Sequence, residues 1–258
     1  MMTDVLTSRL EAILPNGRGV WVPMDHSASS FPEDGLLDSD KAVDAAIEGG
    51  ADAIVMHKGP ISHHFIRTSW GRFVCHASLS TIHGGIRSQD KVLVANPSEG
   101  LDRGAIAMSA QVNIGDPAEP EMIQRMARIT TESHEKEIPV LGMFYPRGSN
   151  LSLDDSDSTS GVAHAARLAW ELGCDVVKVP WTGCEESFGI VASSVPIPVL
   201  VSGGPKGDDF GKVLGLVEKS INAGGSGVCI GRNVFSAVDP ASRIRALRAI
   251  VHDGAKQK

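Results

Sequence analysis

A single lysine at the end of a short apolar run gives the first indication of chemistry. The run covers residues 175–179, and Lys178 within it is soon followed by Pro180. One interpretation is a lysine whose stem packs on apolar neighbours while its ammonium reaches water. The other is an imine-forming nucleophile, whose pKa must fall from roughly 10.4 to roughly 7–8 for the amine to be available. Burial in a barrel is expected to lower the pKa of this lysine by desolvation.

Polar and charged residues follow other short apolar runs in the same way. The runs cover residues 20–24, 53–56, 73–75, 105–112, 140–144, 175–179, 199–201 and 228–230. The residues at or after their ends are Asp25, His26, His57, Lys58, His76, Asn113, Tyr145, Arg147, Lys178, Ser202, Lys206 and Arg232. Each is a weak signal alone, so the interpretation depends on whether the fold brings these ends together.

Glycines at the last two run ends predict a phosphate site. Ser202, Gly203 and Gly204 end one run, and Gly231 with Arg232 ends the next. Glycine lets backbone N–H groups approach an anion closely, and a guanidinium adds a bidentate donor. A glycine pair alone is typical of a tight turn. Two such turns at neighbouring strand ends favour an anion site.

The order of the runs predicts the fold class. Apolar runs without polar alternation are typical of parallel strands buried on both faces. Helices are expected between them, at residues 7–14, 38–47, 97–103, 119–136, 160–172, 185–193, 208–222 and 240–251. The acidic residues 154–159 are expected to form a solvated loop. We therefore predict one (β/α)8 TIM barrel domain over residues 1–258 with a short N-terminal helix, whose active site lies where the carboxyl ends of the strands meet.

Composition excludes several classes of function. The net charge of -7 and the pI near 5.7 argue against a nucleic-acid partner, which a basic surface would attract. The four cysteines show no CxxC spacing and are expected to be reduced thiols. No window approaches 18 apolar residues, so no membrane span is expected. We expect a cytoplasmic protein.

Two other catalytic chemistries fit the sequence poorly. The histidines show no HxxxH or similar ligand spacing, and a metal would make the strand-end lysine redundant, so neither a metal nor another cofactor is expected. No GxSxG elbow is present for a serine hydrolase.

Seven motifs, in order along the chain, resemble those of the archaeal-type class I aldolases. They cover residues 22–26, 56–59, 112–115, 145–148, 177–178, 202–206 and 231–235. This family includes fructose-bisphosphate aldolase and 2-amino-3,7-dideoxy-D-threo-hept-6-ulosonate synthase, and the set is more similar to the synthase branch. Two stretches depart from the family pattern, at residues 26–31 and 76–81, and they leave the substrates open.

The resemblance implies roles for individual residues. Lys178 would form the Schiff base, Tyr145 would act as acid and base, and Asp25 would position or shuttle protons. Phosphate would be bound by Ser202, Gly203 and Gly204 together with Gly231 and Arg232. Further contacts to substrate or phosphate are expected from His26, His57, Lys58, Arg147 and Lys206. The family needs no metal and often forms decamers, so a homo-oligomer is expected.

The expected function is a class I aldolase or transaldolase for small phosphorylated ketoses and aldehydes. It would join a donor derived from a ketose phosphate to L-aspartate semialdehyde, including variants that use dihydroxyacetone phosphate on the way to aminohydroxybenzoate. The alternative is a fructose-1,6-bisphosphate aldolase using dihydroxyacetone phosphate and glyceraldehyde 3-phosphate. A non-catalytic sugar-phosphate sensor and a thiolase-like relative whose lysine forms no lasting imine also remain open.

Overall fold

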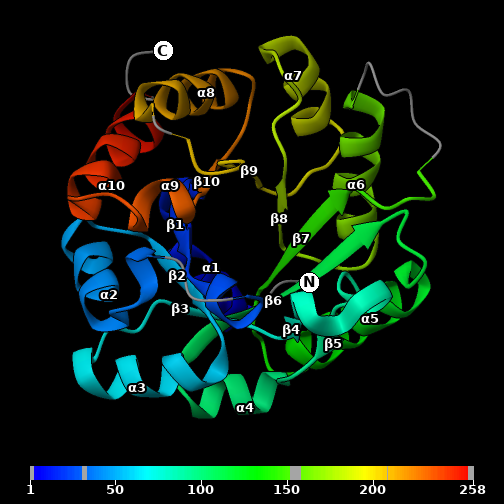
Figure 1. Cartoon of the computed structure of the whole chain (residues 1–258), viewed down its shortest axis with the longest axis horizontal. Helices are drawn as coiled ribbons and strands as arrows, with labels where there is room; N and C mark the ends of the chain where they lie inside the picture. The colour runs from blue at the N-terminus through cyan, green and yellow to red at the C-terminus, as the bar shows by residue number, and fades with distance from the viewer. Residues whose placement is uncertain (1–2, 31–33, 152–157, 208, 255–258) are drawn as a thin grey trace.

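The computed structural model describes residues 3–30, 34–151, 158–207 and 209–254, and within them eight parallel strands close into a barrel (Figure 1). The order around the barrel is β1-β10-β9-β8-β7-β6-β3-β2. The strands are β1 Gly19–Pro23, β2 Ala53–Met56, β3 Phe73–His76, β6 Ala105–Ile114, β7 Val140–Pro146, β8 Val176–Val179, β9 Val199–Ser202 and β10 Gly227–Cys229. The predicted (β/α)8 TIM barrel is confirmed.

Helices surround the barrel at the predicted places. They are α1 Asp4–Ile13, α2 Ser39–Glu48, α3 Lys58–Thr68, α4 Pro97–Asp102, α5 Glu119–His134, α6 Thr159–Glu171, α7 Glu185–Ser193, α8 Phe210–Asn222, α9 Arg232–Phe235 and α10 Pro240–Arg248. Asp38 and Asp209 cap α2 and α8 by accepting backbone N–H groups. The sequence missed α3, whose first turn holds Gly59 and Pro60. Residues 154–157 and the helix start expected at Asp208 lie outside the described residues.

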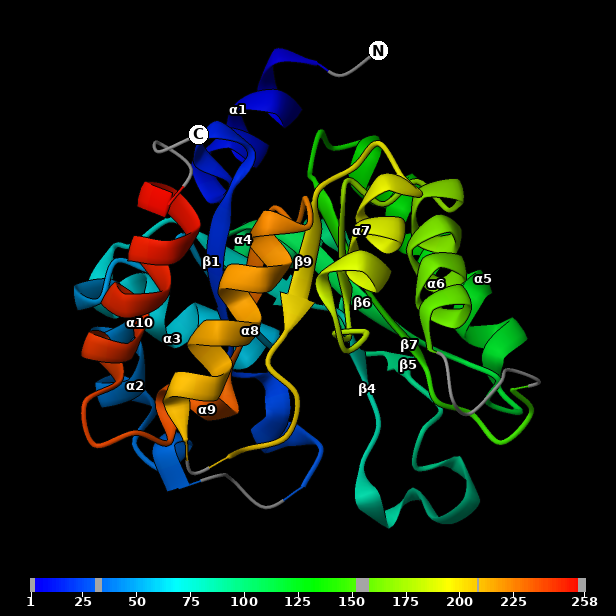
Figure 2. The same cartoon turned by 90° about the horizontal axis from the view of Figure 1, so that it is seen from above.

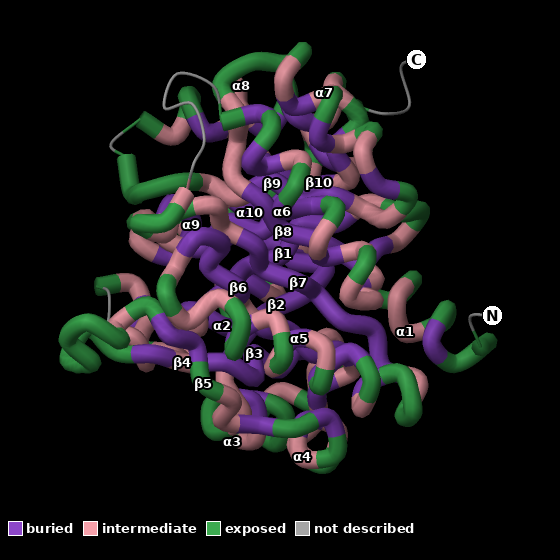
Figure 3. The backbone as a smooth tube through the Cα atoms, turned by 90° about the vertical axis from the view of Figure 1, so that its right-hand side faces the viewer, coloured by how far each residue is buried: buried purple, intermediate pink, exposed green. Residues whose placement is uncertain are grey.

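The strands alternate their side chains between the barrel interior and the helix layer. In β8, Val177 and Val179 pack in the layer between strands and helices, while Val176 belongs to the cluster inside the barrel. Figure 3 shows this buried centre surrounded by helices whose outer faces are exposed. Because side chains on one face of a strand repeat every two residues, Lys178 faces the interior with Val176.

Helix α1 closes the amino-terminal mouth of the barrel. Ile13 and Leu14 pack with Trp21 in the inner cluster, and the Trp21 indole N–H donates to the Ile13 carbonyl at 2.7 Å. Figure 2 shows α1 at one end of the barrel and the β4–β5 connection at the other. Water is thereby excluded from the apolar end, and the polar strand ends face the opposite mouth.

A two-stranded hairpin extends the carboxyl-terminal mouth. It consists of β4 Ser78–Leu79 and β5 Val92–Leu93, which pair antiparallel, with a 3-10 segment over Ile82–Arg87 between them. The sequence predicted only a turn-rich loop here, because two-residue strands are too short to show a periodicity. The hairpin places residues 78–91 beside the barrel mouth. No helix in the described part of the chain has both the length and the apolar character needed to cross a bilayer.

The contact between α1 and the barrel floor can be tested with Ile13→Ala. Ile13 is 0% exposed, so the truncation should lower the free energy of unfolding by about 3 kcal/mol, through lost burial and the cavity left behind. Urea denaturation measures this change. Val5→Ala in the same helix is the matched control, because Val5 is 43% exposed and should change stability by less than about 0.5 kcal/mol. Equal effects of the two substitutions would contradict the role of α1 as a packed plug.

Candidate active site

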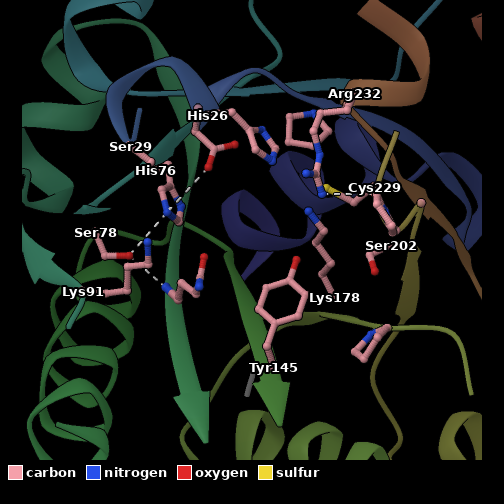
Figure 4. A pocket seen from close by; sticks show the side chains of 18 of the residues that line it. His26, Ser29, His76, Ser78, Lys91, Tyr145, Lys178, Ser202, Cys229 and Arg232 are labelled. Carbon is pink, nitrogen blue, oxygen red and sulfur yellow. Dashed lines mark hydrogen bonds and ion pairs between the residues drawn. The ribbon is translucent and has the colours of Figure 1, made fainter. Parts of the chain in front are cut away.

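The carboxyl ends of the barrel strands surround a cavity of about 450 Å³ (Figure 4). Most of the residues predicted from strand ends line it together. They are Asp25, His26, His57, His76, Tyr145, Arg147, Lys178, Ser202, Gly203, Gly204, Gly231 and Arg232. Barrel closure therefore brings residues from seven strand ends and their following loops to one site.

Three of the predicted strand-end residues, Lys58, Lys206 and Asn113, do not line this cavity. Lys58 begins α3, and its ammonium donates to Glu99 of α4 at 3.0 Å instead of reaching the mouth. The preceding residue, His57, points into the cavity, and the side chain of Lys58 points away from it. Lys206 lies in the loop after β9 and is exposed without lining the cavity. The structure therefore does not place Lys58 and Lys206 with the other predicted site residues, and their contacts to substrate stay predictions.

Lys178 is 5% exposed and sits at the centre of the cavity wall. Burial lowers the pKa of its ammonium, but Cys229, Tyr145 and Asp25 favour the charged form and raise that pKa above its ordinary value. The expectation of a lowered pKa was wrong, because it counted desolvation and not the partners that the fold supplies. In the substrate-free site Lys178 is therefore an ammonium, and a proton must leave before its nitrogen can attack a carbonyl.

Asp25 supplies the negative charge of the site. Burial raises the pKa of its carboxyl, yet His76, His26, Lys178 and His57 outweigh burial and hold that pKa well below its usual range. Its Oδ1 is buried without a hydrogen-bond partner among the described residues. An ionised carboxylate in this position stabilises a cation on Lys178 and can orient a hydroxyl group of a ligand.

His76, at the end of β3, is a site residue that the sequence placed among the strand ends without assigning it a role. Its Nε2 lies 4.0 Å from Asp25 Oδ2, and its Nδ1 lies 2.8 Å from the Ser109 hydroxyl. Burial lowers the pKa of His76 to about 3, with His57 and Lys91 acting in the same direction and Asp25 opposing them. At neutral pH this imidazole is uncharged.

A hydrogen-bond network fixes the side chains next to Tyr145. The Asn113 amide donates to the Gln89 carbonyl at 2.7 Å, and its Oδ1 accepts from Arg147 at 2.9 Å. The same Oδ1 accepts from the Gln111 amide nitrogen at 2.7 Å. Arg147 in turn lies over the Tyr145 ring, 4.9 Å from its centroid. Buried Asn113 thus holds two cavity residues in position without lining the cavity itself.

The loops after β9 and β10 form the region predicted to bind phosphate. Gly204 has φ +66, and a Cβ at Gly231 would lie 2.3 Å from the Pro23 carbonyl oxygen, so both positions require glycine. Arg232 donates to the Gly204 carbonyl at 3.2 Å. Asn233, which the sequence did not single out, donates to the Gly203 carbonyl at 2.9 Å. These contacts tie the two loops together at the cavity, and phosphate binding by them stays a prediction.

The described residues contain one group with metal-ligand spacing, and it lies outside the cavity. Ligand atoms of Asp40, His63 and His64 come within 4.8 Å of one another on α2 and α3. The Arg67 guanidinium lies 3.4 Å from Asp40 Oδ1, and this positive charge opposes a second cation. Asp40 pairs with His63 and Arg67 at the surface of these two helices, while His64 is buried.

Comparison with known proteins identifies the family. Residues 20–237 match the model of the DeoC/LacD family aldolases. The chain belongs to this family. A "2-amino-4,5-dihydroxy-6-oxo-7-(phosphonooxy)heptanoate synthase" from Streptomyces griseus is 35% identical over 90% of this chain and 84% of that protein. A "2-amino-3,7-dideoxy-D-threo-hept-6-ulosonate synthase 1" from Archaeoglobus fulgidus is 37% identical over 95% of this chain and 90% of that protein.

A solved aldolase supports the chemistry of the class. It is an archaeal fructose-1,6-bisphosphate aldolase whose catalytic lysine is bound covalently to a carbinolamine intermediate. Its TM-score is 0.83 at 27% identity, and the match covers 95% of this chain and 99% of that one. The DeoC/LacD chain described here is accordingly a class I aldolase, an enzyme that works through a lysine Schiff base.

The uncharged state of His76 can be checked by NMR of the imidazole nitrogens. With a pKa of about 3, the His76 ring should stay neutral from pH 8 to pH 5 while exposed histidines gain a proton. His76→Gln assigns the signal by its disappearance. His134 provides the comparison within the same sample, because its hydrogen bond with Asp175 raises the pKa of its ring. A His76 midpoint near pH 6 would contradict the pKa shift that we attribute to burial.

Proposed function

We propose that Lys178 is the Schiff-base lysine of this class I aldolase and that Tyr145 and Asp25 serve it. The observation that carries the proposal is the position of Lys178. It is a buried, inward-facing amine at a strand end, with Tyr145 on the neighbouring strand and an ionised carboxylate across the cavity. No other lysine of the described residues combines a position in a barrel strand with the cavity wall.

The charges of the free site suggest the first steps. Lys178 gives up its proton to the Asp25 carboxylate, and its nitrogen attacks the donor ketone. The resulting carbinolamine loses water as Tyr145 protonates the leaving hydroxyl, which leaves a protonated imine and a Tyr145 phenolate. The phenolate then removes a proton from the neighbouring carbon and gives an enamine, with the imine nitrogen as the electron sink. Asp25 orients the donor hydroxyl and stabilises the positive nitrogen.

The bond-forming step needs an aldehyde. The enamine carbon attacks the aldehyde carbon, and the aldehyde oxygen takes the proton held by the Asp25 carboxyl. Water then hydrolyses the protonated imine, which releases the product and returns Lys178 as an ammonium. The donor phosphate is bound by the backbone N–H groups of Gly203, Gly204 and Gly231 and by the Arg232 guanidinium. Ser202, His26 and His57 contribute further polar contacts to the donor, and Arg147 faces the acceptor side.

Product chemistry supports a choice of substrates. A 2-amino-4,5-dihydroxy-6-oxo-7-(phosphonooxy)heptanoate is a β-hydroxy ketone, and reversal of an aldol addition divides it between its fourth and fifth carbons. The fragments are dihydroxyacetone phosphate and aspartate semialdehyde. We propose aspartate semialdehyde as acceptor and a ketose phosphate as donor, in keeping with the names of the two synthases that resemble this chain.

Fructose-1,6-bisphosphate aldolase activity is the second candidate. The likeness to the archaeal enzyme of that activity favours it, at 27% identity. The two candidates share the donor half-reaction and differ in the aldehyde. The homo-oligomer, the expected decamer and the cytoplasmic location stay predictions.

Borohydride trapping tests the lysine. Wild type incubated with dihydroxyacetone phosphate and borohydride should gain the mass of a reduced adduct, mapped to the peptide that contains Lys178. Lys178→Met should form no adduct and lose activity by a factor of about 10⁴ or more, because the covalent route is removed. Lys212→Met, on the exposed surface of α8, is the matched control and should behave as wild type. Activity retained in Lys178→Met would end the proposal.

Competition between aldehydes tests the acceptor. With dihydroxyacetone phosphate as donor, kcat/KM for aspartate semialdehyde should exceed that for glyceraldehyde 3-phosphate by about 100-fold, because recognition of a charged substrate group is worth this order of discrimination. Product formation is followed by mass spectrometry with both aldehydes in one reaction. The reverse preference would assign the second candidate function and leave the role of Lys178 intact.

A further inference from the structure

Lys91 is a buried cavity residue to which the mechanism gives no role. It directly precedes β5 in the hairpin, lines the cavity and is only 9% exposed. Its ammonium makes no ion pair or hydrogen bond with another described residue. The preceding Asp90 is already paired with Arg87 and Arg125, and Arg125 also donates to the Lys91 carbonyl at 3.0 Å. The backbone of Lys91 is therefore anchored while its ammonium has no direct partner among the described residues.

The place of Lys91 differs from that of the predicted phosphate site. Figure 4 shows Lys91 beside Ser78 and His76, with Tyr145 and Lys178 between this group and Arg232 with Ser202. The cavity thus has positive charge on both sides of the Lys178 amine. An aldol adduct extends in both directions from the carbon that Lys178 holds, so two anionic ends can be bound at once.

The charge of Lys91 suits an anionic ligand. Burial lowers its pKa to about 8, with Arg147 acting in the same direction and Asp25 opposing them. The side chain is therefore still mainly protonated at pH 7. A buried ammonium without a counterion is costly, and a carboxylate that reached it would remove that cost and gain a charge-assisted hydrogen bond.

Gln111 adds an acceptor on the same side of the cavity. The orientation of its amide is fixed, because Asn113 Oδ1 accepts from both Arg147 and the Gln111 nitrogen. Gln111 Oε1 has no partner among the described residues, and the side chain lines the cavity. The backbone N–H of Gln111 donates to the Ser78 hydroxyl at 2.9 Å, which puts Gln111 on the side of the cavity where Figure 4 shows Ser78 and Lys91. An acceptor and a buried cation on one side of the cavity match a ligand that carries an ammonium next to its carboxylate.

We propose that Lys91 binds the carboxylate of the acceptor aldehyde and that Gln111 Oε1 accepts from its α-ammonium group. The ligand class is an α-amino-acid aldehyde. This inference rests on the proposed lysine aldolase function, because the enamine on Lys178 places the aldehyde between the two positive sides of the cavity. In this proposal the β4–β5 hairpin, through Lys91, selects which aldehyde is used as the acceptor.

The experiment compares Lys91→Met with wild type on four aldehydes, with dihydroxyacetone phosphate saturating. Aspartate semialdehyde carries carboxylate and ammonium, succinic semialdehyde carries the carboxylate alone, butanal is neutral, and glyceraldehyde 3-phosphate carries phosphate. Loss of one charged hydrogen bond should lower kcat/KM by about 10- to 100-fold for the two carboxylates. For butanal it should change by less than about 3-fold, because butanal has no group for Lys91 to bind.

Further variants separate charge from structure. Lys91→Arg retains the positive charge and should recover most of the activity on both carboxylates, and Lys212→Met should leave all four rates unchanged. Gln111→Leu should lower kcat/KM for aspartate semialdehyde by about 10-fold more than for succinic semialdehyde, since only the former has an ammonium. If Lys91→Met does not fold, Lys91→Gln provides the same comparison.

The outcomes distinguish this inference from the proposed function. The borohydride adduct of dihydroxyacetone phosphate on Lys178 needs no aldehyde and is measured in every variant. A normal adduct with equal losses for butanal and the carboxylates would overturn the role of Lys91 and leave the lysine mechanism standing. Loss confined to glyceraldehyde 3-phosphate would overturn the carboxylate assignment in favour of a phosphate. Absence of the adduct in wild type would overturn the proposed function and, with it, this inference.

Discussion

Closure of eight parallel strands into a barrel is the constraint on which the site depends. Inward-facing residues repeat every two positions, so each strand sends a fixed set of side chains into one narrow interior. At the amino-terminal mouth this set is apolar and is covered by α1 through Ile13 and Trp21. Polar residues are therefore confined to the other mouth. Lys178 lies at the boundary between the two regions, with Val176 beneath it and the cavity above.

This position determines the electrostatics of Lys178. An ammonium in an apolar barrel would be costly alone, because desolvation disfavours the charged form. Asp25, just after β1, places a negative charge in the cavity that stabilises this ammonium. His76 lies beside the Asp25 carboxylate but is uncharged at neutral pH, so it adds no second cation. The free site thus holds an ammonium and a carboxylate whose opposite charges stabilise each other, and Lys178 must lose a proton before its nitrogen can react.

Much of the fold was predictable because its signals are local. Apolar runs without alternation marked all eight barrel strands, and caps such as Asp38 marked helix starts. Helix α3 was not predicted, because Gly59 and Pro60 in its first turn are residues that usually indicate a turn or a loop. Most predicted site residues line the cavity, since strand ends converge in any such barrel. Lys58 is an exception because the sequence does not show which way its side chain points. His57 faces the cavity and Lys58 does not, because the Lys58 ammonium at the start of α3 donates to Glu99 of α4.

Properties that the sequence could not predict depend on partners that are distant along the chain. The pKa of Lys178 follows from groups on β1, β7 and β10, so desolvation alone gave the wrong direction. Lys91 is neither at a barrel strand end nor in a recognisable motif. It reaches the cavity because the β4–β5 hairpin folds over the mouth and because Arg125 of α5 anchors Asp90 and the Lys91 carbonyl.

The two sides of the cavity differ in construction, and this difference bears on how specificity arises. The proposed donor side uses backbone groups of Gly203 and Gly231, where added side chains would collide with Ile230 or the Pro23 carbonyl. Its geometry is tied to the barrel itself, so a change there would disturb the fold. The proposed acceptor side uses the side chains of Lys91 and Gln111, of which Lys91 comes from the β4–β5 hairpin and not from a barrel strand. In the proposed reaction, lysine chemistry and donor binding are consequently fixed by the barrel, while the choice of aldehyde rests in part on an added hairpin.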